Sequence, residues 1–438
     1  MYDIFDDHNE DMEEPANQAE ASQDSETEEG KGKPQQEKQK AETNKLKMLE
    51  EALGFSYEFR FNVILGLPEF RRVEEDEEAW RRMDDYTLNS IVRELKHDGI
   101  TWASRARVGE TIESDFATLQ NPIQEYFKRL SLADNHDYIG ELVRTVTPVA
   151  GAKMFRTFFE KWLVAAVANV FITDRCANHT IFILTGSQGA FKSTWVRNLC
   201  PKALTKYYYE GDLDPENKDD LFATTANLIY NLDDYLANVT KKKINALKSF
   251  ITKNVVKARR PYSRYPEDLP KICSFIGSSN EQTFLYDSTG SRRFLPFEVL
   301  AIDIKAAQKV DMDKVWAQAY RQFRKGFIYW LTKEEEQQLR EYNQQFEVVS
   351  FEYELVAKYF RVPKGRDRAE AYLTNSDILT WLEDKTRKPV SAKRLGDSLK
   401  EQGFERYQVR VGGSARKWVY SIDFATDADI QSATQYGS

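Results

Sequence analysis

A glycine turn between a short apolar run and a Lys-Ser pair is the feature that most constrains how this chain can fold. Residues 180–185 are mostly β-branched or aromatic, as in a buried strand, and residues 186–191 form the turn. Lys192 and Ser193 then stand where a helix would begin. A strand, a glycine turn and a helix in this order bring backbone N–H groups together around phosphate oxygens. The pattern therefore predicts a phosphate-binding loop at residues 186–194 within an α/β fold.

Individual positions of this loop have expected roles. Lys192 supplies a positive charge for the β- and γ-phosphates of a nucleotide, and Ser193 supplies a hydroxyl to Mg²⁺. Phe191 stands where the motif G-x-x-x-x-G-K-[ST] has glycine, so we expect Gly189 to relieve the turn and Phe191 to keep a negative φ. The predicted cofactors are ATP and Mg²⁺. The residues predicted to bind the nucleotide are Gly186, Ser187, Gln188, Gly189, Ala190, Phe191, Lys192, Ser193 and Thr194.

Two adjacent carboxylates end a second strand pattern at residues 226–234. A phosphate-loop enzyme needs one acid near Mg²⁺ and another that orients or deprotonates water. We therefore predict that Asp233 joins Ser193 at the metal and that Asp234 polarises the attacking water. The simpler alternative is a strand followed by an Asp-rich turn.

Further polar residues follow a third strand pattern at residues 271–280. Asn280 ends this strand, and we expect it to sense the γ-phosphate; the alternative is an ordinary turn asparagine. Arg292 and Arg293 then form a pair on a tight turn. Arginine can stabilise transition-state charge on a γ-phosphate, also from a neighbouring subunit. The alternative for this pair is a surface basic patch.

The ordered set of motifs resembles the virulence-associated protein E family. The matching segments are Gln188-Gly189 with Lys192-Ser193-Thr194, and residues 231–234, 248–252, 260–262, 277–280 and 290–294. The resemblance implies a P-loop ATPase of phages or bacterial mobile elements, similar to superfamily 3 helicases and D5-type primase-helicases. It further implies an AAA+-like core, flanked by a mainly helical N-terminal region and a C-terminal winged-helix-like domain.

A basic segment lies between the Asp pair and the strand that ends in Asn280. In ring helicases the corresponding insertion carries a hairpin into the central channel, where cations hold phosphates and aromatic rings stack on bases. An alternative is that Arg259 or Arg260 reaches the nucleotide or a neighbouring subunit. The residues predicted to bind DNA here are Lys257, Arg259, Arg260, Tyr262 and Arg264.

Charge and periodicity suggest four regions. Residues 1–30 hold twelve acidic and no basic residues while the whole chain carries −8, so the remainder is mildly basic at +4. We expect residues 1–47 to be disordered, because they lack the apolar residues that ordering requires. Residues 48–172 are expected to be mainly helical apart from an edge strand near 55–64. The family resemblance implies that this region is a helical collar or an oligomerisation domain; the alternative is simple scaffolding. Residues 173–330 are the expected ATPase domain.

Residues 331–438 read as a separate small domain. Thr332 and Glu335 predict a helix that starts with a capping box. Two capped helices near 374–382 and 391–400, followed by two strand-like runs, predict a winged helix. Its second helix would present Lys393 and Arg394, and its wing Arg416, to DNA. The alternative is a winged helix that binds protein.

The cysteines, the histidines and the longest apolar stretch indicate the cellular compartment of the protein. The three cysteines and four histidines lack the spacing of a zinc site or a disulfide framework, which favours a reducing cytoplasm. Residues 162–172 form the most apolar helical stretch, which is too short to span a membrane, and we expect no signal peptide and no membrane partner.

Together with the family resemblance, these patterns predict an ATP-dependent, DNA helicase-like NTPase that acts in replication of a phage or mobile genetic element. It would hydrolyse ATP at the subunit interfaces of a ring, expected to be a hexamer, on single-stranded or forked DNA, with replication proteins as candidate partners. Two alternatives stay open. One is a regulatory, interference or anti-phage NTPase switch, and the other is a DNA-binding initiator with a degenerate nucleotide site.

Overall fold

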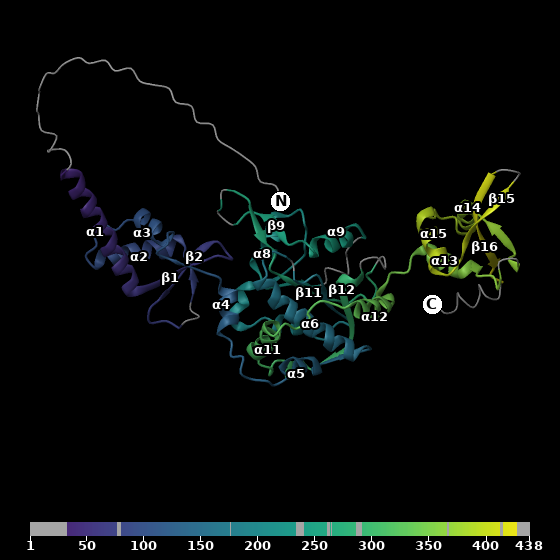
Figure 1. Ribbon diagram of the computed structural model, residues 1–438, viewed down its shortest axis with the longest axis horizontal. Helices are drawn as coiled ribbons and strands as arrows, with labels where there is room; N and C mark the ends of the chain where they lie inside the picture. Colours follow the sequence, from purple (N-terminus) through teal and green to yellow (C-terminus); the bar gives the residue numbers. More distant parts are fainter. Residues whose placement is uncertain are drawn as a thin grey trace, which may run out of the picture. The chain divides into compact units, whose positions relative to one another are not determined.

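The computed structural model has a mixed α/β fold with several sheets, in agreement with the predicted class (Figure 1). It describes residues 33–76, 80–175, 177–233, 241–260, 263, 265–285, 291–365, 368–411 and 415–426. The chain divides into two compact units. The first comprises residues 1–61 and 67–119, and the second comprises residues 62–66 and 120–438.

The first unit is built mainly of helices, together with a small four-stranded sheet. Its strands follow the order β3-β2-β1-β4, so the predicted edge strand near 55–64 is in fact an inner strand, β1. β1 pairs with β2 on one side and with β4 on the other, and Tyr57 and Phe59 of β1 pack with Phe70 of β2 in the core of this unit. The elements are α1 Lys33–Ser56, β1 Tyr57–Asn62, β2 Leu67–Arg72, β3 Arg81–Arg82, α2 Asp85–His97, α3 Arg105–Ile112 and β4 Thr118–Gln120.

Helix α1 corrects part of the expected disordered tail. The helix starts at Lys33, so residues 33–47 are helical, although 38–47 are largely exposed. Leu49 and Leu53 are 1% and 0% exposed and anchor the helix in the core of the first unit. From this anchor the helix extends toward its N-terminus through residues of high helix propensity, mainly Lys, Gln, Glu and Ala. Residues 1–32 lie outside the described part of the chain.

A six-stranded sheet forms the centre of the second unit. The strand order is β5-β12-β6-β11-β8-β7, in which β12, β6, β11, β8 and β7 run parallel and β5 is antiparallel to β12. The residues of β6 and β11 are all buried, as is typical of parallel sheets covered on both faces. The strands are β5 Val146–Pro148, β6 Ile181–Thr185, β7 Tyr208–Glu210, β8 Ile229–Asp233, β11 Ser274–Ser279 and β12 Phe294–Ile302.

Two apolar clusters cover the two faces of this sheet. On one face Phe182 and Leu184 of β6 pack with the largest cluster, which contains α6. On the other face Ile181 and Ile183 pack with α9 and with the hairpin of β9 and β10. The covering elements are α4 Pro122–Arg129, α5 Tyr138–Arg144, α6 Ala152–Phe171, α7 Lys192–Asn198, α8 Lys218–Ala226, α9 Lys241–Ile251, β9 Val255–Ala258, β10 Glu267–Pro270, α10 Ile304–Ala307, α11 Met312–Arg324 and α12 Lys333–Asn343.

Both expected borders of the central domain need correction. The sequence placed its start at residue 173, but α6 belongs to the sheet because Phe159 packs edge-to-face on Phe182 at 5.2 Å between ring centroids. The sequence placed its end at residue 330, but α12 also packs on the sheet. The side-chain amide of Asn343 in α12 donates to the carbonyl oxygens of Ser291 and Phe294, at 3.0 and 3.1 Å.

The remaining C-terminal elements have a core of their own. As predicted, two capped helices precede an antiparallel strand pair, and α14 starts with a capping box of Thr374 and Asp377. The predicted capping box of Thr332 and Glu335 at the start of α12 is also confirmed. The C-terminal elements are α13 Phe351–Tyr359, β13 Phe360–Arg361, β14 Ala371–Leu373, α14 Asn375–Thr386, α15 Ala392–Glu401, β15 Arg406–Val411 and β16 Ala415–Phe424.

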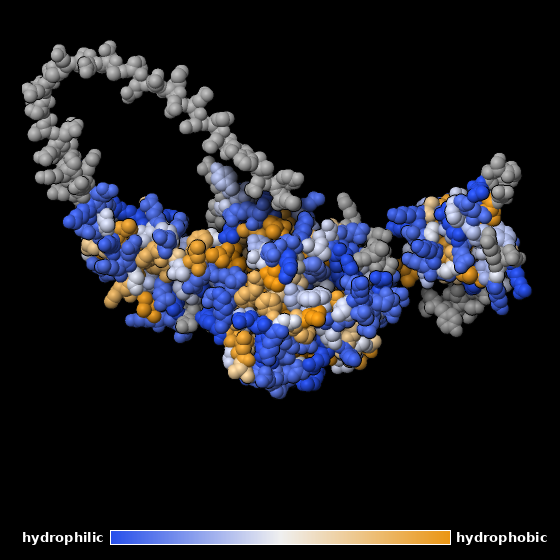
Figure 2. Space-filling model, in the orientation of Figure 1, coloured by the Kyte–Doolittle hydropathy of each residue, from blue (hydrophilic) through white to orange (hydrophobic). Residues whose placement is uncertain are grey.

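Hydrophilic residues predominate on the face drawn in Figure 2, with patches of apolar residues between them. Within the described residues, every helix is too short or too polar to cross a membrane.

Candidate functional site

The turn between β6 and α7 needs glycine at its first position. Gly186 has a φ of 135°, and a Cβ there would lie 2.6 Å from the carbonyl oxygen of Val299 on β12. Gly189 has a φ of 87° with open space around it. Both backbone angles lie where side chains are strongly disfavoured, so the two glycines let the chain reverse tightly above the sheet.

Phe191 corrects the expectation of a negative φ. Its φ is 60° and its ψ 22°, in the left-handed region, and its side chain is 54% exposed. Among the described non-glycine residues, Arg387 alone shares a positive φ. The turn into α7 therefore imposes on Phe191 the conformation that glycine usually supplies in this motif. A bulky residue adopts it at a cost of roughly 1–2 kcal/mol.

The ammonium of Lys192 lies inside the turn and is held by three neutral acceptors. Lys192 Nζ donates to the carbonyl oxygens of Gly186 and Ser187, at 2.7 and 2.8 Å, and to Asn280 Oδ1 at 3.0 Å. The residue is 5% exposed. The structure thus brings together two predicted residues, Lys192 and Asn280, that are 88 positions apart in the chain.

Ser193 and Asp233 also meet, together with a residue that the sequence did not single out. Ser193 Oγ donates to Asp233 Oδ1 at 2.8 Å. Ser278 Oγ lies 3.1 Å from Ser193 Oγ and donates a short hydrogen bond to the same Asp233 oxygen. The parallel register places Ser278 beside Asp233 on neighbouring strands. The available signal was a small polar residue near the end of a buried strand, two positions before Asn280.

The donor set of this cluster fits Mg²⁺. Hydroxyl and carboxylate oxygens suit hard cations, and Mg²⁺ in proteins usually takes one or two carboxylates and completes its shell with phosphate oxygens and water. Ser193 and Asp233 could therefore hold the ion as predicted. Within the described part of the chain, no group of three or more Asp, Glu, His or Cys residues forms a metal-binding cluster. Asp234 lies outside the described residues.

A second polar network joins α7 to β7 and β8. Arg197 and Glu210 form a bidentate ion pair, with Nε–Oε2 at 2.8 Å and Nη2–Oε1 at 2.5 Å. These hydrogen bonds from Arg197 lower the pKa of the Glu210 carboxyl. The amide of Asn231 donates to the same carboxylate at 3.2 Å and to the Tyr208 hydroxyl at 2.9 Å. Because Asn231 precedes Asp233 by two positions, the network ties the strand that carries Asp233 to the helix that carries Ser193.

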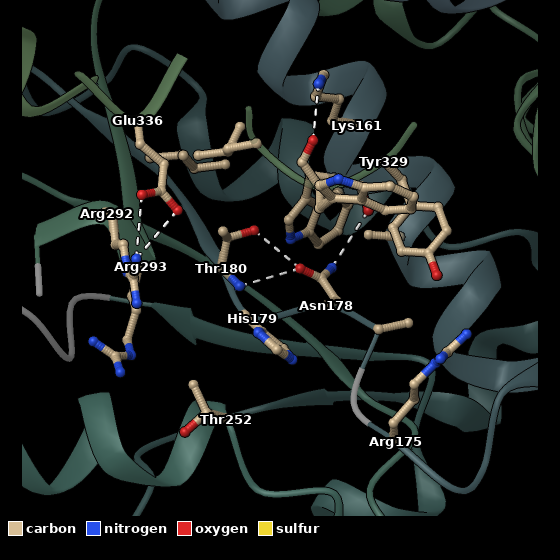
Figure 3. A pocket seen from close by; sticks show the side chains of 16 residues that line it. Lys161, Arg175, Asn178, His179, Thr180, Thr252, Arg292, Arg293, Tyr329 and Glu336 are labelled. Carbon is tan, nitrogen blue, oxygen red and sulfur yellow. Dashed lines mark hydrogen bonds and ion pairs between the residues drawn. The ribbon is translucent and has the colours of Figure 1, made fainter. Parts of the chain in front are cut away.

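Arg292 and Arg293 lie at the end of the sheet where the parallel strands β6 and β12 begin, opposite the end that carries Lys192. They directly precede β12, whose first residue, Phe294, pairs in parallel with Ile181 at the start of β6. Lys192 follows the opposite end of β6, so one chain does not bring these arginines to its own loop. Arg292 Nη1 lies 3.2 Å from Glu336 Oε2 (Figure 3). Among the residues that the structure describes, none forms a hydrogen bond with the buried Arg293 Nε.

The predicted DNA-binding residues of the basic segment have different environments. β9 and β10 form the expected antiparallel hairpin, in which Lys257 is exposed and pairs opposite Asp268. Arg259 Nε donates to the Ser263 carbonyl oxygen at 2.6 Å. The side chain of Arg260 is 19% exposed, and its Nε lies 3.5 Å from Glu267 Oε2. The same side chain packs against Gly66. Arg260 is therefore a packed residue and is not part of an open surface. Tyr262 and Arg264 are not among the described residues.

The predicted DNA-binding residues of the C-terminal elements are all exposed. Lys393 and Arg394 lie in the first turn of α15, and Arg416 lies on β16.

Comparisons with known proteins place the site within a family. A solved structure described as the apo structure of the NrS-1 C-terminal region (305–718) is similar at 14% identity and a TM-score of 0.48, and the match covers 87% of this chain and 99% of that chain. An A-form apo structure of the same region gives 14% identity and a TM-score of 0.45, over 86% and 98% of the two chains. No curated protein matches. Residues 128–348, about half of the chain, match the model of the virulence-associated protein E-like domain. This span contains the 186–194 loop, Asp233, Ser278 and Asn280, and the chain therefore belongs to the virulence-associated protein E-like family.

Proposed function

We propose that this chain is an ATP hydrolase of the P-loop class that acts on DNA during replication of a phage or mobile element. One observation carries the proposal. Lys192, Ser193, Asp233, Ser278 and Asn280 converge at the carboxyl ends of three adjacent parallel strands, β6, β11 and β8. Ligands of open α/β sheets bind at this edge.

The charges in this cluster support phosphate binding. Lys192 Nζ donates to three uncharged oxygens, two of which belong to the loop itself. Phosphate oxygens can replace these acceptors, and a positive charge there stabilises the transferred phosphoryl group. The Asn280 Nδ2–H group would donate to the γ-phosphate, and Asn280 Oδ1, once replaced on Lys192, could accept from the attacking water.

The metal and the water have candidate ligands of their own. When bound, Mg²⁺ neutralises charge that develops on the β- and γ-oxygens. Ser193 and Asp233 would hold it, and Ser278 orients the Asp233 carboxylate. We assign the polarisation of the attacking water to Asp234, which directly follows Asp233.

The arginine pair supports hydrolysis between subunits. Because Arg292 and Arg293 lie at the sheet edge opposite Lys192, they would complete the site of a neighbouring copy. In a head-to-tail assembly, a surface of one copy faces a different surface of the next, and such interfaces close into rings. We propose that copies of this chain assemble into such a ring and that the ring is a hexamer.

DNA would contact the ring through the exposed basic residues. Lys257 and the 66% exposed Tyr265 lie on the β9–β10 hairpin and its loop, where a cation and a ring suit a single strand. In the C-terminal elements the order helix, turn, helix and hairpin is that of a winged helix, in which Lys393 and Arg394 would face DNA.

The decisive experiment measures ATP hydrolysis by the purified chain with and without single-stranded DNA, together with unwinding of a forked duplex. Lys192→Ala should abolish hydrolysis, whereas Lys202→Ala, at an exposed lysine outside the cluster, should not change it. Hydrolysis without unwinding would favour a regulatory NTPase switch. DNA binding without nucleotide binding would favour an initiator with a degenerate site. Equal turnover by wild type and Lys192→Ala would refute the phosphate site.

A further inference from the structure

The antiparallel strands β15 and β16 form a two-stranded ribbon that extends beyond the core of the C-terminal elements. Tyr420 and Ile422 of β16 belong to this core, whereas Trp418, on the same face of the strand, is 46% exposed. The register sets Gln408 opposite Trp418 and Arg406 opposite Tyr420, so these residues share that face. The ribbon therefore carries an exposed indole ring on the continuation of the face that packs in the core.

A cation holds the indole ring of Trp418. The guanidinium carbon of Arg406 lies 5.2 Å from the centroid of the ring. A cation at this distance is attracted to the face of the ring, and the attraction favours one orientation of the side chain. Because the ring stays half exposed, another flat group can stack on it. Single exposed aromatic residues are common, so the surroundings of Trp418 decide its meaning.

The first turns of α14 and α15 lie beside this part of β16. Strand β14 ends at Leu373, opposite Tyr420, and α14 begins two residues later at Asn375. Continued in register, Asn375 would fall opposite Trp418. The side-chain amide of Asn375 donates to the carbonyl oxygen of Ala392, the first residue of α15, at 2.8 Å. The start of α15 and the exposed ring therefore belong to one surface.

Exposed cations surround the ring on this surface. Two lie in the first turn of α15 and two on the ribbon, and they are Lys393, Arg394, Arg406 and Arg416. None of the four forms an ion pair with an acid in the part of the chain that the structure describes. Their charges can therefore neutralise the phosphates of a nucleic acid.

The combination of cations and one exposed ring favours a particular DNA structure. A surface that contacts only duplex phosphates needs the cations and has no use for the ring. Unpaired bases, in contrast, stack on aromatic side chains almost regardless of their sequence. Tryptophan and arginine also dominate many protein–protein contacts, but a group of cations without acidic partners suits a polyanion better.

We propose that the C-terminal elements bind DNA where a duplex opens into a single strand, and that Trp418 stacks on the first unpaired base. Lys393, Arg394 and Arg416 hold phosphates of the adjoining duplex. Arg406 is a positioning residue, since it acts through the ring that it contacts. This inference rests on the proposed function, in which the C-terminal elements contact DNA, and it names the DNA structure that they select.

The test measures binding of the full-length chain to a labelled blunt duplex and to the same duplex with a single-stranded tail. Trp418→Ala should weaken binding of the tailed duplex about tenfold and change binding of the blunt duplex less than about twofold. Trp418→Phe should recover most of the loss, because a phenyl ring still stacks. Trp418→Leu, which keeps an apolar side chain without a ring, should behave like Trp418→Ala.

A matched control and a base analogue locate the contact. Trp330 is 58% exposed and lies outside the C-terminal elements, so Trp330→Ala should bind both DNAs like wild type. With 2-aminopurine at the first unpaired position, wild type and Trp330→Ala should quench the fluorescence of the base, and Trp418→Ala should not. With 2-aminopurine at the fourth unpaired position, all three proteins should give the same signal.

The cations should have a different signature. Lys393→Gln and Arg416→Gln should weaken binding of the tailed and the blunt duplex by the same factor. Each should also reduce the slope of log affinity against log salt concentration by about one, as expected for the loss of one phosphate contact.

The unfavourable outcomes can be told apart. If Trp418→Ala keeps the preference for the tailed duplex, the inference is overturned and the proposed function stands. Equal losses on both DNAs also overturn it, because the ring would then serve DNA binding in general. A chain that hydrolyses ATP but binds neither DNA overturns the inference together with the DNA part of the proposed function, and favours a protein partner. Junction binding as expected by a chain that does not hydrolyse ATP supports the inference and overturns the proposed hydrolase.

Discussion

Substitution of Gly186 or of Gly189 by alanine tests two physical requirements of the 186–194 loop, a positive φ angle and a close approach to another strand. Both glycines have positive φ angles, so alanine at either position is strained. The surroundings differ. A Cβ at Gly186 would lie 2.6 Å from the backbone oxygen of Val299, whereas a Cβ at Gly189 would meet nothing within 4 Å. The first substitution adds a backbone clash to the strain, and the second adds strain alone.

The structure sets the expected magnitudes. Left-handed strain alone should destabilise Gly189→Ala by about 1–2 kcal/mol. In Gly186→Ala, β12 must also move away from β6, with which its residues Phe294–Glu298 pair along the whole of the buried strand β6. We expect a total of about 3–5 kcal/mol for this variant, at the upper end for single substitutions.

Calorimetry of the two purified variants checks the difference. At roughly 2–4 °C per kcal/mol for a domain of this size, Gly189→Ala should lower Tm by a few degrees and Gly186→Ala by about 10 °C. Gly326→Ala is the matched control, because Gly326 also has a positive φ, 78°, with nothing within 4 Å, and lies outside the loop. Equal shifts for Gly186→Ala and Gly189→Ala would refute the argument from close approach.

Three further predictions concern the surroundings of the loop. Ser278→Ala should lower Mg²⁺-dependent hydrolysis by about 10–100-fold, because Asp233 loses a positioning partner, and should leave Mg²⁺-free nucleotide binding unchanged; a Mg²⁺ titration of turnover would reveal an unchanged dependence if this is wrong. Phe191→Val should be less stable than Phe191→Gly by about 1–2 kcal/mol, since a β-branched residue resists the left-handed region, and equal melting temperatures would contradict the observed backbone. The lowered pKa of Glu210 means that its pairing with Arg197 stabilises the fold above the usual carboxyl pKa of 4.5 and that this contribution is lost as the pH falls through the lowered value; Arg197→Gln should therefore be less stable than wild type at pH 7 and converge with it in acid, and a pH-independent difference in denaturation midpoints would argue against the pairing.

Much of the candidate site follows from local sequence. Asp233 ends a buried strand, and Lys192, Ser193 and Asn280 follow buried strands. Because parallel strands align their carboxyl ends, the meeting of these residues could be foreseen. The contact between Ser278 and Asp233 could not be foreseen. It depends on β11 lying between β6 and β8 in the sheet, whereas β11 follows both strands in the chain.

Other features depend on packing that no local pattern contains. The backbone of Phe191 is set by the entry into α7, which overrides the preference of a bulky side chain. The burial of Arg260 depends on a close approach to Gly66, almost two hundred positions away. Helix α6 looked like the end of a separate region, and its role appears once Phe159 is seen against Phe182 of the central sheet.

The two edges of the central sheet have a consequence for how copies of this chain can associate. The edge strands, β5 and β7, are each three residues long. An edge this short exposes little unpaired backbone, so addition of a strand from another molecule gains few hydrogen bonds. Copies that associate at the central sheet must therefore do so through side-chain surfaces, and this sheet should resist the edge-to-edge β-aggregation that affects sheets with long open edges.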